Sequence, residues 1–117
     1  MPSTTSYKRG DVVLVPIPFT DLSSAKQRPA LVISGDAFNS TRDDILVAAI
    51  TSQVLATLAS DEFLIPVSDL RTAGLPKPLI VKLSKLVSLH QQLVIRRIGT
   101  LNPQTVPQLL AQLRQLF

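Results

Sequence analysis

The fold is decided by the stretch Gln27-Arg28-Pro29-Ala30-Leu31-Val32-Ile33-Ser34, taken together with a second apolar run from Ile45 to Ser52. Each run is short and aliphatic, a pattern typical of a β-strand. Pro29 is tolerated because it lies at the start of its strand, where a missing N–H donor costs least. Arg28 thus stands at the mouth of one strand, while the hydroxyls of Thr51 and Ser52 stand at the end of the other. If the strands pair, guanidinium and hydroxyls converge on a rigid apolar platform, which suits the handling of a phosphate.

Length and composition bound the class of protein. We expect the 117 residues to fold as one domain, 1–117, with a core that needs neither a disulfide nor a metal. The lack of cysteine excludes a disulfide scaffold, a cysteine-based zinc site and a cysteine nucleophile, and it fits a reducing compartment. No apolar run approaches the roughly 20 residues that span a bilayer, and no signal-peptide pattern follows the first residues. A soluble, cytoplasmic protein without a membrane partner is therefore expected.

The charges are unevenly distributed along the chain. All of the acidic residues lie at or before Asp69, so the bases that follow have no acid to balance them. These bases are Arg71, Lys77, Lys82, Lys85, Arg96, Arg97 and Arg114. A basic half of this kind favours an anionic partner, either a nucleic acid or an acidic protein segment. A solvated basic face explains the charges about as well.

The remaining pattern predicts a mainly β chain. Further strands are expected at 12–15, at 63–67, at 79–89 and at 93–98, and loops at 20–27, 35–44, 53–61 and 68–77. The first of these strands is expected to be central, and Pro66 predicts that the second lies at a sheet edge. Alternation along 79–83 places Leu83 in the core and Lys82 on the opposite face. Together with the C-terminal helix described next, these strands predict a small, strongly bent β-barrel closed by a helix.

The C-terminal segment has the clearest helical pattern in the chain. Asn102 is expected to cap the helix with Pro103 in its first position, although Pro107 allows a later start. Apolar residues at helical spacing form one face. They are Val106, Leu109, Leu110, Leu113, Leu116 and Phe117.

The usual enzymatic signatures are missing from the sequence. It has no glycine-rich phosphate loop, no metal-spaced set of ligands and no triad partner for His90, which lies in a predicted turn. No metal or cofactor is expected. Arg28 cannot act as a base, but its guanidinium can hold a phosphate and stabilise added negative charge. Taken singly, Arg28 is more often a surface ion-pair residue, and Thr51 and Ser52 are more often strand-end hydrogen-bonding residues.

Several short motifs follow one another along the chain. They are Arg9 to Val15, Pro18 to Asp21, Lys26 to Ser34, Ala49 to Ser52, Gly74-Leu75 with Pro78, and Ile98 to Leu101. Read together, they resemble the MazF/PemK family of toxin ribonucleases from toxin-antitoxin pairs, and the resemblance covers nearly the whole chain. It implies an SH3-like β-barrel with a C-terminal α-helix, usually a homodimer whose groove between subunits holds single-stranded RNA.

The resemblance also implies a sequence-selective, metal-independent cleavage of RNA. The ribose 2′-OH attacks the adjacent phosphate and leaves a cyclic phosphate and a 5′-hydroxyl. The family's arginine before the proline falls on Arg28 and its strand-end threonine on Thr51, which are the expected catalytic pair. The acidic C-terminal segment of a cognate antitoxin is expected to occupy the same basic groove. The residues expected to bind the RNA are Thr20, Lys26, Ser52, Lys77 and Lys82.

The resemblance leaves several points open. If a general base is needed, it is Asp21, Thr51 acting through water, or a group that the sequence does not identify. Ser84 stands where many relatives have an acid, and Leu79 stands where many have a serine after the proline. These two differences affect the expected sequence preference and dimer contacts more than the chemistry. Two alternatives are a CcdB-like gyrase-inhibiting toxin and a catalytically inactive relative that binds RNA or antitoxin. The presence of both Arg28 and Thr51 argues against them.

Overall fold

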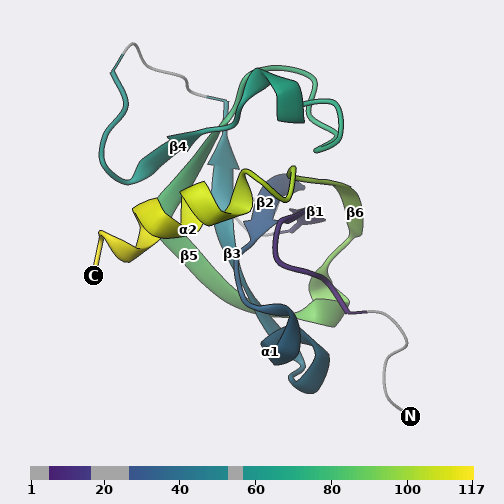
Figure 1. Ribbon diagram of the computed structural model, residues 1–117. Helices are drawn as coiled ribbons and strands as arrows, with labels where there is room; N and C mark the ends of the chain where they lie inside the picture. Colours follow the sequence, from purple (N-terminus) through teal and green to yellow (C-terminus); the bar gives the residue numbers. More distant parts are fainter. Residues whose placement is uncertain (1–5, 17–26, 53–56) are drawn as a thin grey trace.

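The computed structural model describes residues 6–16, 27–52 and 57–117 (Figure 1). Within these ranges, six strands form one antiparallel sheet in the order β4-β5-β3-β2-β1-β6. The strands are β1 (Asp11–Val15), β2 (Arg28–Val32), β3 (Asp44–Thr51), β4 (Glu62–Leu64), β5 (Ile80–His90) and β6 (Arg96–Thr100). The helices are α1 (Asp36–Thr41) and α2 (Val106–Arg114), with short 3-10 turns η1 (Val67–Asp69) and η2 (Gln91–Leu93).

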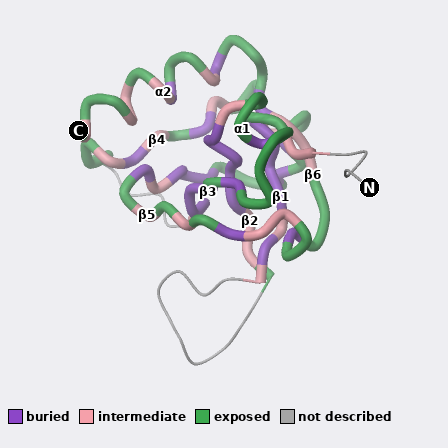
Figure 2. Tube along the Cα trace, turned by 90° about the horizontal axis from the view of Figure 1, so that it is seen from below, coloured by how far each residue is buried: buried purple, intermediate pink, exposed green. Residues whose placement is uncertain are grey.

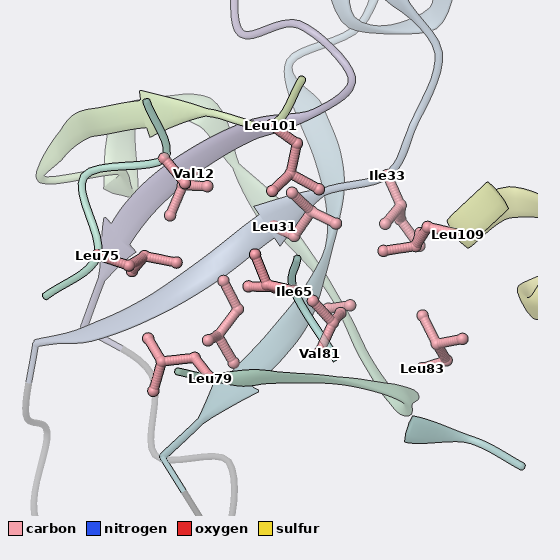
Figure 3. Close-up of a cluster of buried hydrophobic side chains, with 13 residues drawn as sticks. Val12, Leu31, Ile33, Ile65, Leu75, Leu79, Val81, Leu83, Leu101 and Leu109 are labelled. Carbon is pink, nitrogen blue, oxygen red and sulfur yellow. The ribbon is translucent and has the colours of Figure 1, made fainter. Parts of the chain in front are cut away.

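The sheet buries side chains on both of its faces, because neighbouring residues of a strand point to opposite sides. On one face, Leu31 packs with Leu83 and with Leu109 of α2, which lies across the sheet (Figures 1 and 3). On the other face, Val13 and Val32 belong to a second buried cluster. Figure 2 shows the consequence, since the central strands are largely buried whereas α2 keeps many exposed residues.

The sheet is strongly curved, and the curvature has a local cause in β5. The register between β3 and β5 shifts between Ala48, which is opposite Leu86, and Ala49, which is opposite Lys82. The extra residues of β5 form a bulge, and bulges bend a strand and increase its twist. The predicted bent, barrel-like sheet with a C-terminal helix is confirmed, although the sheet is open and β4 and β6 are its edges. The central position of β1 and the edge position of β4 are also as predicted.

The segment expected to be a loop at 35–44 contains the short helix α1. Tertiary hydrogen bonds explain the difference. Asn39 is buried, accepts a hydrogen bond from the Ser34 hydroxyl at 2.5 Å and donates from Nδ2 to the carbonyl of Tyr7 at 2.8 Å. The partner Tyr7 is far away in sequence, so no local pattern reveals this anchor.

The last strand begins later than expected, at Arg96 rather than at Leu93. Gln91 donates hydrogen bonds to the carbonyls of Asn39 at 2.8 Å and Arg42 at 2.9 Å. These bonds hold residues 91–93 in the turn η2. His90, predicted to lie in a turn, is instead the last residue of β5 and caps η2, because its Nδ1 accepts a hydrogen bond from the backbone N–H of Gln92.

The C-terminal helix also begins later than its expected cap. Helix α2 starts at Val106, and Pro107 lies in its first turn, where the missing N–H has no helical partner. Asn102 instead accepts a hydrogen bond from the backbone N–H of Gln104 at 2.9 Å, which forms a turn before the helix. The apolar face of the helix packs as expected, except that Phe117 is 90% exposed. Among the described residues, no helix is long and apolar enough to cross a bilayer.

Candidate functional site

The pairing of β2 with β3 brings together the two ends singled out in the sequence. The strands are antiparallel, with Ala30 opposite Ala49. Arg28 comes two residues before Ala30, and Thr51 comes two residues after Ala49, so both lie at the same end of the pair. Arg28, Thr51 and Ser52 line one cleft. The two apolar runs do pair, which is the condition that the sequence set for bringing the guanidinium and the hydroxyls together, and the three residues share one cavity.

This cleft has a volume of about 560 Å³. Apolar residues such as Ile50 and Leu79 contribute to both the cleft and the buried core, which gives the cleft a rigid base. Of the residues expected to bind RNA, Thr20 and Lys26 lie outside the described residues, and the others line the cleft. The polar residues of its wall are Arg28, Thr51, Ser52, Glu62, Lys77, Lys82 and Lys85.

Arg28 carries a buried hydrogen-bond donor. Within the described part of the chain, its Nε atom is buried and donates to no hydrogen-bond acceptor. A buried donor without a partner costs about 1–3 kcal/mol. Arg28 also lines the cleft, so an oxygen-rich anion there would meet the positive charge of its guanidinium.

The wall of the cleft that carries Lys77 is held against β6 by two glycines. Gly74 adopts a positive φ of 73°, and a Cβ at this position would lie 2.1 Å from the carbonyl oxygen of Ile98. A Cβ at Gly99 would lie 2.4 Å from the carbonyl oxygen of Thr72. Only glycine fits so close an approach of two backbones. The sequence places Gly74 in a loop, and in the structure it allows this close packing against Ile98.

Two further lining residues of the cleft, Glu62 and Lys82, belong to an ion cluster that the sequence did not reveal. Lys82 Nζ lies 2.9 Å from Glu62 Oε2 and 3.8 Å from Asp61 Oδ2. The Ser84 hydroxyl donates to Asp61 Oδ2, and the backbone N–H of Ala59 donates to Glu62 Oε1 at 2.8 Å. Glu62 is only 8% exposed. We call Asp61, Glu62 and Lys82 the Lys82 cluster.

The sequence gives no direct signal for the Lys82 cluster, because Asp61 and Glu62 lie at the start of β4 whereas Lys82 lies in β5. Glu62 in β4 is opposite Lys82 in β5. A pairing of segments separated by a loop cannot be read from local alternation. The expectation that Lys82 points away from the core is confirmed, since Lys82 lines the cleft whereas Leu83 is fully buried. The unexpected serine at 84 lies beside Asp61.

Hydrogen bonds and charge shift the pKa values of the Lys82 cluster. The bond from the Ser84 hydroxyl, helped by the Lys82 ammonium, lowers the pKa of Asp61. The backbone N–H of Ala59, followed by the bond from Lys82, lowers the pKa of Glu62. The bond with Glu62 in turn raises the pKa of Lys82. Glu62 is thus ionised at neutral pH and a weak proton acceptor, which makes it a poor general base.

The lowered pKa of Glu62 predicts a pH-dependent loss of stability in the variant Glu62→Gln. A carboxyl whose pKa is lower in the folded state contributes stability above its unfolded pKa, which is about 4.3 for glutamate. That contribution is lost as the pH falls through the lowered folded value. The free energy of unfolding in urea should therefore differ most between wild type and Glu62→Gln near pH 7, and the difference should shrink below about pH 4.

The control for this measurement is Asp43→Asn, which removes an exposed carboxylate outside the cleft. It gives the baseline effect of losing one negative charge. A Glu62→Gln difference that stays constant down to pH 3 would mean that the charge of Glu62 does not stabilise the fold.

Solved structures with a similar fold include several toxins. A mycobacterial endoribonuclease in complex with its cognate antitoxin gives a TM-score of 0.72 at 19% identity, covering 94% of this chain and 93% of that chain. The Mycobacterium tuberculosis toxin MazF-mt6 gives 0.70 at 19% identity, covering 90% and 93%. A MazE-MazF structure from Deinococcus radiodurans gives 0.69 at 18% identity, covering 96% of each chain. At these identities the likeness establishes a shared fold.

Sequence comparison identifies the family. No curated protein matches the chain by sequence. A sequence model of the family described as "PemK-like, MazF-like toxin of type II toxin-antitoxin system" matches residues 8–117, nearly the whole chain. The resemblance noted in the short motifs is thereby confirmed, and this chain belongs to the PemK-like, MazF-like toxins of type II toxin-antitoxin systems.

Proposed function

We propose that this toxin is an endoribonuclease that cuts single-stranded RNA at short sequences without a metal, and that a cognate antitoxin neutralises it. The observation that carries the proposal is the convergence of Arg28, Thr51 and Ser52 on one cleft that also contains lysines. Membership of the toxin family supports the antitoxin as partner. A homodimer and a cytoplasmic location, where mRNA is translated, are part of the same proposal.

The proposed reaction is a transfer of the phosphate within the RNA. The 2′-oxygen of one ribose attacks the adjacent phosphorus and loses its proton, and the bond from phosphorus to the 5′-oxygen breaks. The leaving 5′-oxygen gains a proton, so the products are a 2′,3′-cyclic phosphate and a 5′-hydroxyl. Arg28, which lines the cleft, stabilises the extra negative charge on the phosphorus-bound oxygens through its guanidinium. Thr51 positions the phosphate through its hydroxyl.

The cations around this centre are proposed to hold the RNA backbone. Lys77 and Lys85 line the cleft together with Arg28. Positive side chains in a groove bind the phosphates of a single strand without regard to sequence. An acidic antitoxin segment would be attracted by the same charges, so it would compete with RNA for the cleft.

The function is tested in two separate reactions. In the first, the purified protein is mixed with purified single-stranded RNA in EDTA. In the second, without EDTA, it is mixed with DNA gyrase and relaxed plasmid. The expected result is cut RNA and unaffected supercoiling. Intact RNA with inhibited gyrase would favour a CcdB-like toxin. RNA that is bound but not cut would identify a catalytically inactive relative.

Thr51→Ala is expected to reduce turnover more than RNA affinity. An interaction made mainly in the transition state lowers kcat when it is removed, whereas uniform binding lowers affinity. Single-turnover cleavage and the binding of an uncleavable 2′-O-methyl RNA measure the two effects separately. Thr51→Ser, which keeps the hydroxyl, is the control and should retain most of the rate. Equal losses of binding and turnover in Thr51→Ala would make Thr51 a binding residue only.

A further inference from the structure

This inference rests on the proposed function and concerns how the same cleft selects its RNA. We propose that the Lys82 cluster reads the edge of a nucleobase and does not bind a phosphate. Lys82 is the donor and Glu62 the acceptor in this reading. The contact determines which nucleotide is accepted next to the cut bond.

The first argument is the local charge. Lys82 lies within 4 Å of two carboxylates, so the cluster carries a net negative charge at neutral pH. A phosphate entering here would be repelled by Asp61 and Glu62 as well as attracted by Lys82. Within the described ranges, Lys77 and Lys85 make no ion pair, so their charges are available to phosphates.

The second argument is chemical complementarity. An ammonium beside a carboxylate offers N–H donors and oxygen acceptors next to one another. The hydrogen-bonding edge of a base has the same neighbouring arrangement, and single-stranded RNA exposes this edge to proteins. Lysine bonds to base carbonyl oxygens and acidic side chains accept from base N–H groups. A neutral base, unlike a phosphate, is also not repelled by the carboxylates.

The third argument is rigidity, which selective recognition requires. Glu62 is fixed by the N–H of Ala59 and by Lys82, and its own carbonyl accepts from Gln112 Nε2 of α2 at 2.8 Å. The same amide of Gln112 donates to the carbonyl of Ser60 at 3.0 Å. The helix thus fastens the edge strand that carries the acceptor. Side chains that are already fixed in this way lose little conformational entropy when they bind a base.

The cluster is also placed where a base can reach it. Glu62 and Lys82 line the same cleft as Arg28 and Thr51. A strand whose phosphate binds at Arg28 can therefore place an adjoining nucleotide in the same cleft, beside Glu62 of β4 and Lys82 of β5. The cleft volume of about 560 Å³ is large enough for a nucleotide.

The test compares Lys82→Met and Glu62→Gln with the control Lys85→Met. Each protein is mixed with a long RNA, the cut positions are mapped by sequencing the new 5′ ends, and binding to an uncleavable 2′-O-methyl RNA is titrated with salt. Both cluster variants should relax the base preference at one position of the cut sequence by about 10-fold or more. The dependence of log affinity on log salt should stay as in wild type. Lys85→Met should instead reduce that slope by about 0.7 and leave the cut sequence unchanged.

Two outcomes would overturn the inference. In the first, Lys82→Met reduces the slope of log affinity against log salt by about 0.7 and leaves the cut sequence unchanged, which would make Lys82 a phosphate contact. In the second, the Glu62→Gln protein cuts the same sequences as wild type; this substitution preserves the shape of the side chain. If wild type itself cuts no RNA, the proposed function fails and this inference fails with it. If wild type cuts and the variants cut identically, only this inference fails. Thermal melting of each protein confirms that it is folded.

Discussion

Arg28→Ala should lower the rate of RNA cleavage by about 10²- to 10³-fold, the usual effect of removing one donor that stabilises a developing oxyanion. Arg28 lines the cleft together with Thr51, where its guanidinium can stabilise negative charge on the phosphate. The loss should therefore appear in the chemical step, measured as the single-turnover rate with saturating protein.

The fold should survive this change. Arg28 is the first residue of β2 and is only partly buried, whereas the strand is held by buried Leu31 and Val32. Arg28→Lys is the matched control, because it keeps the charge but loses the bidentate geometry, and its rate should fall between those of wild type and Arg28→Ala. A near-normal rate for Arg28→Ala, with unchanged melting, would remove Arg28 from the catalytic site.

Leu109→Ala should lower the free energy of unfolding by about 2–5 kcal/mol, the cost of cutting a buried leucine down to alanine. Leu109 is 1% exposed and is the buried residue of α2. It belongs to the same cluster as Ile33, which follows β2, and Leu83 of β5 (Figure 3). Urea unfolding at pH 7 measures the change. The matched control is Gln108→Ala, its exposed neighbour, which should change the free energy by less than about 0.5 kcal/mol. A loss of under about 1 kcal/mol in Leu109→Ala would contradict the packing of α2 on the sheet.

Local pattern was enough to predict the central strands and the end of the sheet where the cleft lies. The apolar runs behind Arg28 and before Thr51 pair as expected because each is short, aliphatic and bounded by polar residues. The position of Pro29 at the start of its strand could be predicted because a proline is tolerated at few positions in a sheet. The roles of Thr20 and Lys26 stay predictions, since both lie outside the described residues.

What local pattern missed depends on contacts between distant segments. The helix α1 forms around Asn39, whose partner Tyr7 is 32 residues away. The Lys82 cluster depends on the pairing of β4 with β5, and Glu62 is 20 residues from Lys82. In the sequence, Lys82 is one of the bases after Asp69 that have no acidic residue among them. The fold pairs it with carboxylates from the acidic half, which changes the ligand that it can bind.

The chemistry of the RNA ends tests the central claim most directly. Purified protein is incubated with a long RNA in EDTA, and the fragments are offered to polynucleotide kinase with and without phosphatase treatment. The proposed reaction predicts 5′-hydroxyl ends that are labelled without phosphatase, at a recurring short sequence, and a loss of about 10²-fold or more with Arg28→Ala. Uncut RNA, 5′-phosphate ends, or equal cutting by Arg28→Ala would contradict it.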